Sequence, residues 1–430
     1  MRLLTLDHYF GQDLEALGAA SDEDVQFDVM PFADLRSEAL RVFPIEVATG
    51  LKAFARPELE PARQRYATIL REVLEDRFTR APFDAIVMPS DSFFYVRAAP
   101  QIAHSLGVPF LVVQKETTIS ELTMREHAEV VRRYAPPLAD RMTVCSERHK
   151  QFWLRTGADP AKVVVTGQPR FDLYLRPSTP ALTRGSDADM PTVLFLSYAV
   201  DAYHPDEGTG GSAWELLHHQ TEAGLHELAR RGWRVLIKPH PQQALAAVRV
   251  WRERAGDLWD RRIFLVEPGA DARKLILAAD VVVGFQSTAL LEAMLAGRPV
   301  VYTGWDEQAT AMGQDLIPFA DWGDLITVQR SPGELADAVT SLLSTRCSDA
   351  ALARRREIAE RYLGPLDGGA SRRTLEVIAG EVSSWARRRD DHQDELRRRL
   401  AARRPPLRLA RRGRAGVRVA RRRLGAILGR

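Results

Sequence analysis

The chain has 430 residues, of which 45% are hydrophobic and 27% are charged. This length exceeds what one hydrophobic core usually organises and predicts two domains with an additional segment, and the composition is typical of a soluble globular protein. The two cysteines, Cys145 and Cys347, lie far apart in the sequence, which argues against a disulfide framework and favours a reducing, cytoplasmic environment. No apolar run approaches the roughly 20 residues that cross a membrane, and the N-terminal apolar run is too short for a signal peptide.

Short apolar segments alternate with helical patterns along the first 175 residues. Helical spacing is found from Asp13, over residues 58–77, and in the segment that ends at Leu106, where Gly107 is a helix-terminating glycine. This alternation predicts a parallel sheet with helices on both faces. Strands are predicted at Arg2–Leu6, Val25–Met30, Asp84–Met88, Pro109–Val113, Asp140–Cys145 and Lys162–Thr166.

A second cycle of the same kind follows residues 176–191, a stretch rich in Pro, Ser, Thr, Gly and Asp that predicts an interdomain linker. The predicted architecture is therefore α/β, with two Rossmann-like, doubly wound domains facing a central cleft. They span residues 1–175 and 192–380, and a basic tail spans residues 381–430. Strands of the second domain are predicted at Thr192–Ser197, Trp233–Ile237, Arg261–Glu267, Asp280–Gly284 and Pro299–Thr303, and helices at residues 214–231, before Ala278 and at residues 331–343.

The segment Ala279–Asp306 (ADVVVGFQSTALLEAMLAGRPVVYTGWD) predicts a strand, a polar turn, a helix and another strand. Gln286, Ser287 and Thr288 form the turn, and Gly297 is placed to end the helix. The turn follows the C-terminal end of a strand, where open α/β sheets bind ligands, and helix N–H groups there attract anions such as a diphosphate. The alternative is an ordinary βαβ unit in which the two hydroxyl residues only cap the helix.

The sequence KPHP, which contains Lys238 and His240, directly follows the predicted strand Trp233–Ile237. A cation and an imidazole held beside rigid prolines at a strand end form a preorganised place for phosphate oxygens. Together with the Gln-Ser-Thr turn, this motif predicts a diphosphate-binding site in the second domain.

With KPHP, VTGQPRFD, GFQSTALLEAMLAGRPVV and YLGPLDGGASRR, the chain resembles bacterial GT-B transferases of surface-polysaccharide synthesis. The nearest groups are the CDP-glycerol glycerophosphotransferase-like and capsule-polysaccharide transferases, and the resemblance covers residues 80–375. It implies a GT-B-like fold whose C-terminal domain holds a nucleotide-sugar or CDP-polyol donor. The N-terminal domain would hold a lipid-linked or polysaccharide acceptor, and neither a metal ion nor a cofactor would be needed.

The resemblance also implies roles for individual residues. His240 falls on the family's phosphate-contacting histidine, and Glu292 falls on an acidic residue that often contacts ribose. The G-x-P-R-x-D turn with Arg170 and Asp172 is expected to be mostly structural. The predicted donor-binding set is Lys238, His240, Gln286, Ser287, Thr288 and Glu292.

An inverting transfer requires a general base for the acceptor and stabilisation of the leaving diphosphate, the latter assigned to His240. Glycerophosphotransferases usually carry Trp-His-Gly after the strand that ends here at Val113, whereas this chain has Gln-Lys-Glu. The resulting candidates for the base are Glu116, then Asp91, then His8, and for the first two a capping or surface role is the alternative.

Two further histidine-containing stretches could suggest metal ligands. They are Tyr203–Glu207 and the pair His218–His219, but their spacing matches no familiar metal site. We expect them to lie in a loop and on the surface of a helix.

The net charge of +3 conceals a strong asymmetry. Leu396–Arg430 contains 14 Arg and no acidic residue, whereas the remaining chain holds 46 basic and 57 acidic residues. A basic amphipathic helix over this segment would bind the anionic inner face of a membrane, and a solvated tail is the alternative. Nucleic-acid binding is not expected, because the tail has no aromatic side chain and the body is acidic. The apolar side of the expected helix consists of Leu409, Val417, Leu424, Ile427 and Leu428.

The predicted function is transfer of a sugar or polyol phosphate to a lipid-linked or polysaccharide acceptor by a cytoplasmic, peripheral membrane enzyme. Non-hydrolysing nucleotide-sugar 2-epimerases share the double-Rossmann plan and are the first alternative. They carry Ser-Gly-Gly where this chain has Gln-Ser-Thr, and they lack a basic tail. The second alternative is a non-catalytic sugar-binding protein of the same fold.

Overall fold

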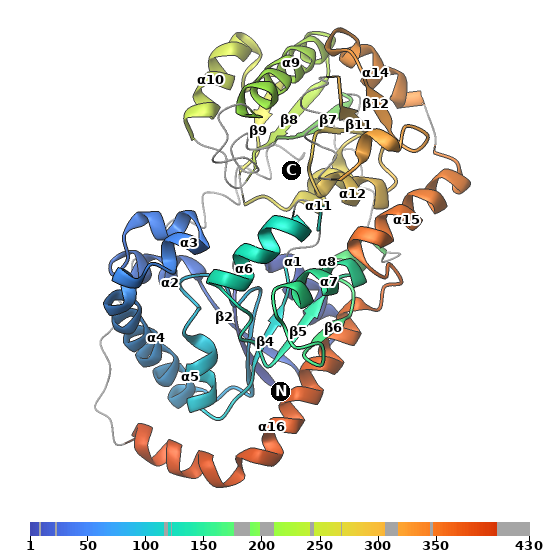
Figure 1. Ribbon diagram of the computed structural model, residues 1–430. Helices are drawn as coiled ribbons and strands as arrows, with labels where there is room; N and C mark the ends of the chain where they lie inside the picture. Colours follow the sequence, from blue (N-terminus) through green and yellow to red (C-terminus); the bar gives the residue numbers. More distant parts are fainter. Residues whose placement is uncertain are drawn as a thin grey trace. The chain divides into compact units, whose positions relative to one another are not determined.

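The computed structural model describes residues 1–7, 10–21, 24–115, 119–121, 123–175, 190–197, 210–240, 245–267, 269–305, 317–344 and 347–401. They form two compact units (Figure 1). The first unit contains the described residues up to 175 together with residues 360–401, and the second contains those between 190 and 359. This division differs from the sequence-based boundary at residue 380, because the chain returns to the first unit at Glu360.

The sheet of the first unit has six parallel strands in the order β2-β1-β3-β4-β5-β6. All six strands predicted for this region are confirmed. Their bounds are β1 Arg2–Leu6, β2 Gln26–Met30, β3 Ala85–Met88, β4 Phe110–Val113, β5 Arg141–Val144 and β6 Val163–Val165.

The sheet of the second unit is also parallel, in the order β12-β11-β10-β7-β8-β9. The five strands predicted there are confirmed, and the three-residue edge strand β12 was not predicted. Their bounds are β7 Thr192–Leu196, β8 Arg234–Lys238, β9 Ile263–Leu265, β10 Val281–Gly284, β11 Val300–Thr303 and β12 Thr327–Gln329.

Helices connect the strands in both units, and α15 (Asp349–Leu363) leads from the second unit back to the first. The first unit contains α1 Gly11–Ala20, α2 Phe32–Leu40, α3 Leu51–Phe54, α4 Glu60–Arg80, α5 Ala99–Ser105, α6 Ala128–Tyr134, α7 Glu147–Arg155, α8 Pro169–Leu175 and α16 Ala370–Ala401. The second contains α9 Gly210–Arg230, α10 Leu245–Ala255, α11 Ala272–Ala278, α12 Ala289–Leu295 and α14 Leu335–Ser341.

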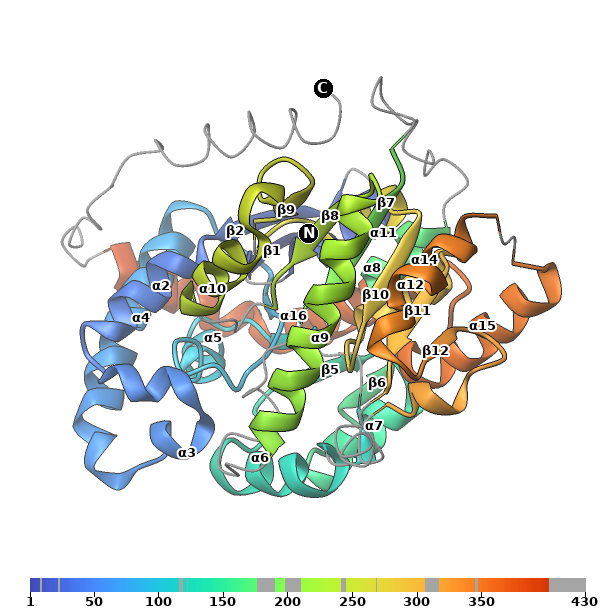
Figure 2. The same ribbon diagram turned by 90° about the horizontal axis from the view of Figure 1, so that it is seen from above.

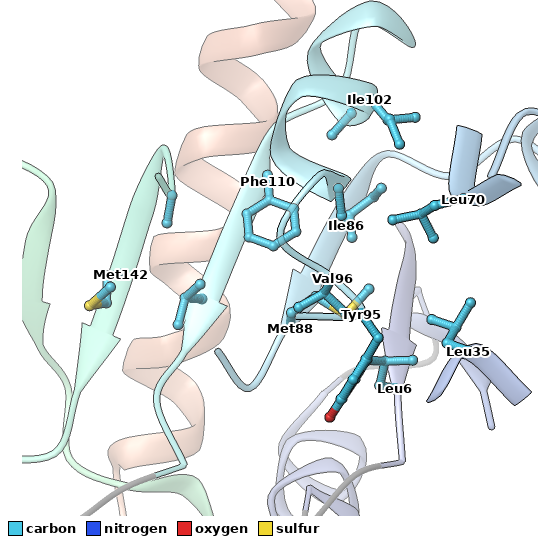
Figure 3. Packing of buried hydrophobic residues seen from close by; sticks show 14 of the residues in the cluster. Leu6, Leu35, Leu70, Ile86, Met88, Tyr95, Val96, Ile102, Phe110 and Met142 are labelled. Atoms are coloured by element: carbon cyan, nitrogen blue, oxygen red, sulfur yellow. The ribbon is translucent and has the colours of Figure 1, made fainter. Parts of the chain in front are cut away.

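The larger core of the first unit lies between its sheet and the helices that include α2, α4 and α5 (Figure 3). Each large apolar side chain buried there contributes about 1.5–3 kcal/mol relative to its exposed state. Strand residues Leu6, Ile86, Met88, Phe110 and Met142 meet Leu35, Leu70, Tyr95, Val96 and Ile102 in this core.

The opposite face of the same sheet is covered by α1 and α16. Parallel strands buried on both faces carry apolar side chains in both directions, and here Val87 and Val113 point to this second core. Ile378 of α16 is fully buried against it together with Leu17 of α1. The C-terminal helix is therefore part of the first unit's core.

The G-x-P-R-x-D turn attaches this helix. The Asp172 carboxylate accepts hydrogen bonds from the backbone N–H groups of Ala370 (3.2 Å) and Ser371 (2.7 Å) at the start of α16. These N–H groups have no partner within the helix, and a carboxylate there also complements the helix dipole. The contact supports the expected structural role of Asp172.

Gly364 lies where α15 gives way to the loop before α16. Its φ is +83°, and a Cβ at this position would overlap the carbonyl oxygen of Cys145. Gly368, in the same loop, has a similar φ of +76°, but a Cβ there would meet nothing within 4 Å. Substitutions at these two positions therefore allow the cost of backbone strain to be measured separately from the cost of close packing.

We predict that Gly364→Ala lowers the free energy of unfolding by about 3 kcal/mol or more, because left-handed strain adds to a backbone overlap. Gly368→Ala adds only the strain, about 1–2 kcal/mol. Urea denaturation of the two variants measures the difference. Equal destabilisation would show that the approach to Cys145 relaxes without cost.

Candidate functional site

The strand order of the second sheet identifies the edge at which a ligand site is expected. β7 comes first in the chain but lies between β10 and β8, so the chain runs outward from it on both sides. In open α/β sheets, ligands bind outside the carboxyl ends of the strands at such a reversal. The KPHP motif begins at the last residue of β8 and the Gln-Ser-Thr turn follows β10, so the fold brings the two predicted motifs to this edge.

Lys238 is the last residue of β8 and is partly buried. Burial lowers its pKa, whereas the negative charges of Glu292 on α12 and of Asp271 raise it. Glu292 is 6% exposed. The structure therefore brings Lys238 and Glu292, predicted from separate motifs, into one charged group, and it places the partly buried His240 two residues beyond β8.

The turn after β10 opens the seven-residue helix α12. The Ser287 hydroxyl accepts a 3.3 Å hydrogen bond from the N–H of Ala289, which is the capping role that was the alternative for this residue. Thr288 occupies the N-cap position without a side-chain hydrogen bond to the helix. As predicted, Gly297 follows the helix with a positive φ of +68°.

Gln286 is 4% exposed and is tied into the protein. Its amide nitrogen donates to the Tyr302 hydroxyl and to the carbonyl of Ile317, both at 3.0 Å, and its amide oxygen accepts from the N–H of Ile317 at 3.2 Å. Both amide hydrogens are thus committed to β11 and to the segment around Ile317. This geometry favours a supporting role for Gln286 over direct ligand contact.

In the first unit, Asp91 lies beyond the end of β3 and is fully buried. One carboxylate oxygen accepts from the N–H groups of Leu138 (2.6 Å) and Ala139 (3.2 Å), and the other has no hydrogen-bond partner among the described residues. Burial raises the pKa of Asp91, and the hydrogen bonds and the charge of Arg97 oppose this effect. The contacts correspond to the capping alternative. Glu116 and His8 lie outside the described residues.

A buried polar group at the same edge was not predicted as a site. Asp13 on α1 is 0% exposed and accepts from the Gln168 side chain (2.7 Å) and from the N–H of Arg170 (3.0 Å). An acidic residue in the first turn of a helix that follows a strand was the available signal, but the sequence did not show its partners, which lie 155 and 157 residues away.

The expectation that His218 lies on a helix surface is wrong. His218 is 6% exposed, whereas His219 is exposed. The other histidine-containing stretch, residues 203–207, and most of the basic tail lie outside the described residues. Within the described ranges, no three His, Cys, Asp or Glu side chains are grouped to hold a metal ion, and no helix is long and apolar enough to cross a membrane.

No protein-family model matches the chain, and a comparison with curated proteins gives no match. Solved structures do match its fold. UDP-GlcNAc 2-epimerase from Neisseria meningitidis, bound to UDP-GlcNAc, has a TM-score of 0.50 at 16% identity, over 88% of this chain and 100% of the other. The UDP-N-acetylglucosamine 2-epimerase from Rickettsia bellii has a TM-score of 0.51 at 14% identity, over 89% of this chain and 97% of its own. The UDP-GlcNAc 2-epimerase from Methanocaldococcus jannaschii, in complex with UDP-GlcNAc and UDP, has a TM-score of 0.50 at 14% identity. The match covers 88% of this chain and 99% of the other.

These matches show a GT-B-like fold of two Rossmann-like domains, as predicted. They overturn the prediction of a sugar or polyol-phosphate transferase, because the matching structures are isomerases of a nucleotide sugar. The error has a chemical reason. From the sequence, KPHP and the Gln-Ser-Thr turn are interpreted as groups that bind a diphosphate. Both classes of enzyme bind a diphosphate, so these motifs do not distinguish transfer from isomerisation.

We predict that Asp91→Asn changes the pH dependence of stability. The folded-state pKa of Asp91 is raised, so its stabilising contribution is complete below the ordinary carboxyl pKa of about 4 and is lost as pH rises through the folded-state value. Asn has no such titration and retains an oxygen acceptor for Leu138 and Ala139. Urea denaturation between pH 4.5 and 8 should therefore show the variant gaining stability relative to wild type as pH rises, whereas parallel curves would contradict the assignment.

Proposed function

We propose that the protein binds a UDP-activated sugar and interconverts the sugar with its C2 epimer, as a nucleotide-sugar 2-epimerase-like isomerase. The observation that carries this proposal is the likeness in fold to UDP-GlcNAc 2-epimerases over 88–89% of this chain and 97–100% of theirs. The likeness extends to both units, so the proposal concerns a whole two-domain enzyme.

The chemistry of the second unit supports a nucleotide ligand. Lys238 and His240 provide a cation and an imidazole for phosphate oxygens at the end of β8, and Ser287 and Thr288 place hydroxyl groups after the end of β10, on the other side of β7. Glu292 lies close enough to influence the charge of Lys238 and offers an acceptor for ribose hydroxyls. These five residues are our proposed nucleotide-binding set.

One difference from the 2-epimerases stands at the turn itself. Where they carry Ser-Gly-Gly, this chain has Gln286, Ser287 and Thr288. Gln286 packs into the protein through its amide, so it does not extend into the edge. Two hydroxyl side chains then replace two glycines, which adds polar groups for phosphate or sugar and narrows the space available to the ligand.

The proposal predicts that the purified protein converts UDP-GlcNAc into its C2 epimer, detected by NMR of the sugar resonances. His240→Ala should lower turnover by about 10² or more if the imidazole acts on charge that develops at the diphosphate. Ligand-induced stabilisation of the wild type should reach about 2.7 kcal/mol at 100 times Kd.

His219→Ala is the matched control, because it removes an exposed imidazole from α9 of the same unit. Its turnover should equal that of wild type. UDP-GlcNAc binding with no epimer formed would contradict the isomerase proposal and support the non-catalytic sugar-binding alternative. Full activity of a folded His240→Ala protein would remove His240 from the site.

We also propose that the arginine-rich segment Leu396–Arg430 binds anionic membrane surfaces. The support is the sequence alone, with 14 Arg and no acidic residue attached to a body of opposite charge. Each Arg near such a surface contributes about 1 kcal/mol, and salt screens this attraction over a Debye length of about 8–10 Å.

This proposal predicts that the full chain co-sediments with phosphatidylglycerol vesicles and that salt reverses the binding. Truncation after Asp394 should abolish it and leave UDP-GlcNAc binding unchanged. Vesicles of phosphatidylcholine alone are the control for charge. Equal sedimentation with both lipids, or sedimentation of the truncated protein, would show that the arginines are not the anchor.

A further inference from the structure

Four polar side chains form a continuous chain inside the second unit, apart from the residues assigned above. The Ser197 hydroxyl lies 2.9 Å from Nε2 of His218, and Nδ1 of His218 lies 2.9 Å from Oε1 of Glu222. Oε2 of Glu222 accepts from Arg254 at 3.1 Å. Ser197, His218 and Glu222 are 4%, 6% and 2% exposed. This is the connectivity of a hydroxyl, a base and a residue that orients the base.

Side chains of α9, α10 and β7 hold these hydrogen-bonded residues in place. His218 and Glu222 are four residues apart on α9 and therefore lie on one face of that helix, which packs against β8 (Figure 2). The His218 ring stacks on Trp251 of α10 at 5.1 Å and 14°, and it meets the edge of Phe195 of β7 at 5.3 Å. The imidazole thus packs against aromatic rings from two other elements.

The hydrogen bonds determine where the protons lie. Burial raises the pKa of Glu222, but hydrogen bonds and charges from His218 and Arg254 outweigh burial and leave the pKa below its ordinary value. An ionised carboxylate only accepts, so Nδ1 of His218 donates to it. When the imidazole is neutral, Nε2 is the acceptor and the Ser197 hydroxyl donates its single proton to it.

The sheet register places Ser197 between the two motifs of the candidate site. Leu196, the last residue of β7, pairs with Lys238 on one side and with Gly284 on the other. Ser197 is the next residue, and its N–H donates to the carbonyl of Lys238 at 3.0 Å. Ser197 therefore lies at the same edge as Lys238 and the turn after β10, with its hydroxyl bonded to His218 of α9.

We propose that Ser197 contacts the bound nucleotide sugar through its hydroxyl oxygen, accepting a hydrogen bond from a hydroxyl group of the ribose or of the sugar. His218 and Glu222 are positioning residues that direct the Ser197 proton away from the ligand. The inference rests on the proposed function and adds a specificity residue to it. While His218 is neutral, phosphate oxygens are not the partner, because they only accept and the Ser197 proton is donated to His218.

Binding measurements with UDP-GlcNAc, UDP, 2′-deoxy-UDP and inorganic diphosphate test this assignment. Ser197→Ala should weaken UDP-GlcNAc binding about three- to tenfold, the usual effect of one neutral hydrogen bond, and leave diphosphate binding unchanged. Equal weakening for UDP, but not for 2′-deoxy-UDP, identifies the ribose 2′-hydroxyl. Weakening confined to UDP-GlcNAc identifies the sugar.

A double-mutant cycle tests the positioning role. His218→Leu should weaken UDP-GlcNAc binding in the wild-type background and have no further effect in the Ser197→Ala background, because it acts through Ser197. A Ser197→Thr variant keeps a hydroxyl group at this position and should therefore bind UDP-GlcNAc more tightly than the Ser197→Ala variant does. Thr221→Val is the control. It removes a buried hydroxyl of α9 that bonds only the carbonyl of Leu217 in the described contacts, so it should change thermal stability alone.

Several outcomes would overturn the inference. If the Ser197→Ala variant binds every probe as the wild type does, the hydrogen-bonded series from Ser197 to Arg254 is purely structural. Weaker diphosphate binding would make Ser197 a phosphate donor, and independent effects of the two substitutions would remove the link through His218. If the wild type binds none of the nucleotides, the proposed function fails and this inference fails with it.

Discussion

The two hydrogen-bonded pairings of β7 determine which parts of the second unit act together. Through them a single central strand places Lys238 at one side and Gly284 at the other, at the level of Leu196. Every group in the proposed nucleotide-binding set ends or follows β8 or β10, and the hydrogen-bonded series of Ser197, His218 and Glu222 begins just after β7. If the register shifted by one residue, alternate side chains would change faces and both the core and the edge would be lost.

Burial of charge is the second constraint on this edge. Lys238 is placed where burial disfavours its charged form, and Glu292 and Asp271 offset that penalty. In the proposed function, a bound diphosphate would add further negative charge beside this desolvated cation. By contrast, Gln286 uses both amide hydrogens in bonds within the protein, and one carboxylate oxygen of Asp91 accepts from Leu138 and Ala139.

The first unit depends on a segment far from it in the sequence. α16 covers one face of the sheet, with Ile378 in the core and its first N–H groups capped by Asp172. A nucleotide-sugar 2-epimerase and a transferase can share this plan, since the fold provides two strand edges and leaves the reaction to the groups placed there. The comparison with solved structures, and not the motif pattern, is what favours isomerisation in our proposal.

The sequence by itself determined the α/β class and eleven of the twelve strands of the described structure, because buried parallel strands require uninterrupted apolar runs between helical patterns. It also located the KPHP and Gln-Ser-Thr motifs at strand ends. β12 escaped prediction as a three-residue edge strand with little apolar content. Only the tertiary structure decided that residues 360–401 return to the first unit, that Asp91 caps a loop, and that His218 is buried between Ser197 and Glu222. Each of these three features depends on contacts between residues distant in the chain, or on which face of a helix packs against the sheet. Local sequence patterns do not determine either.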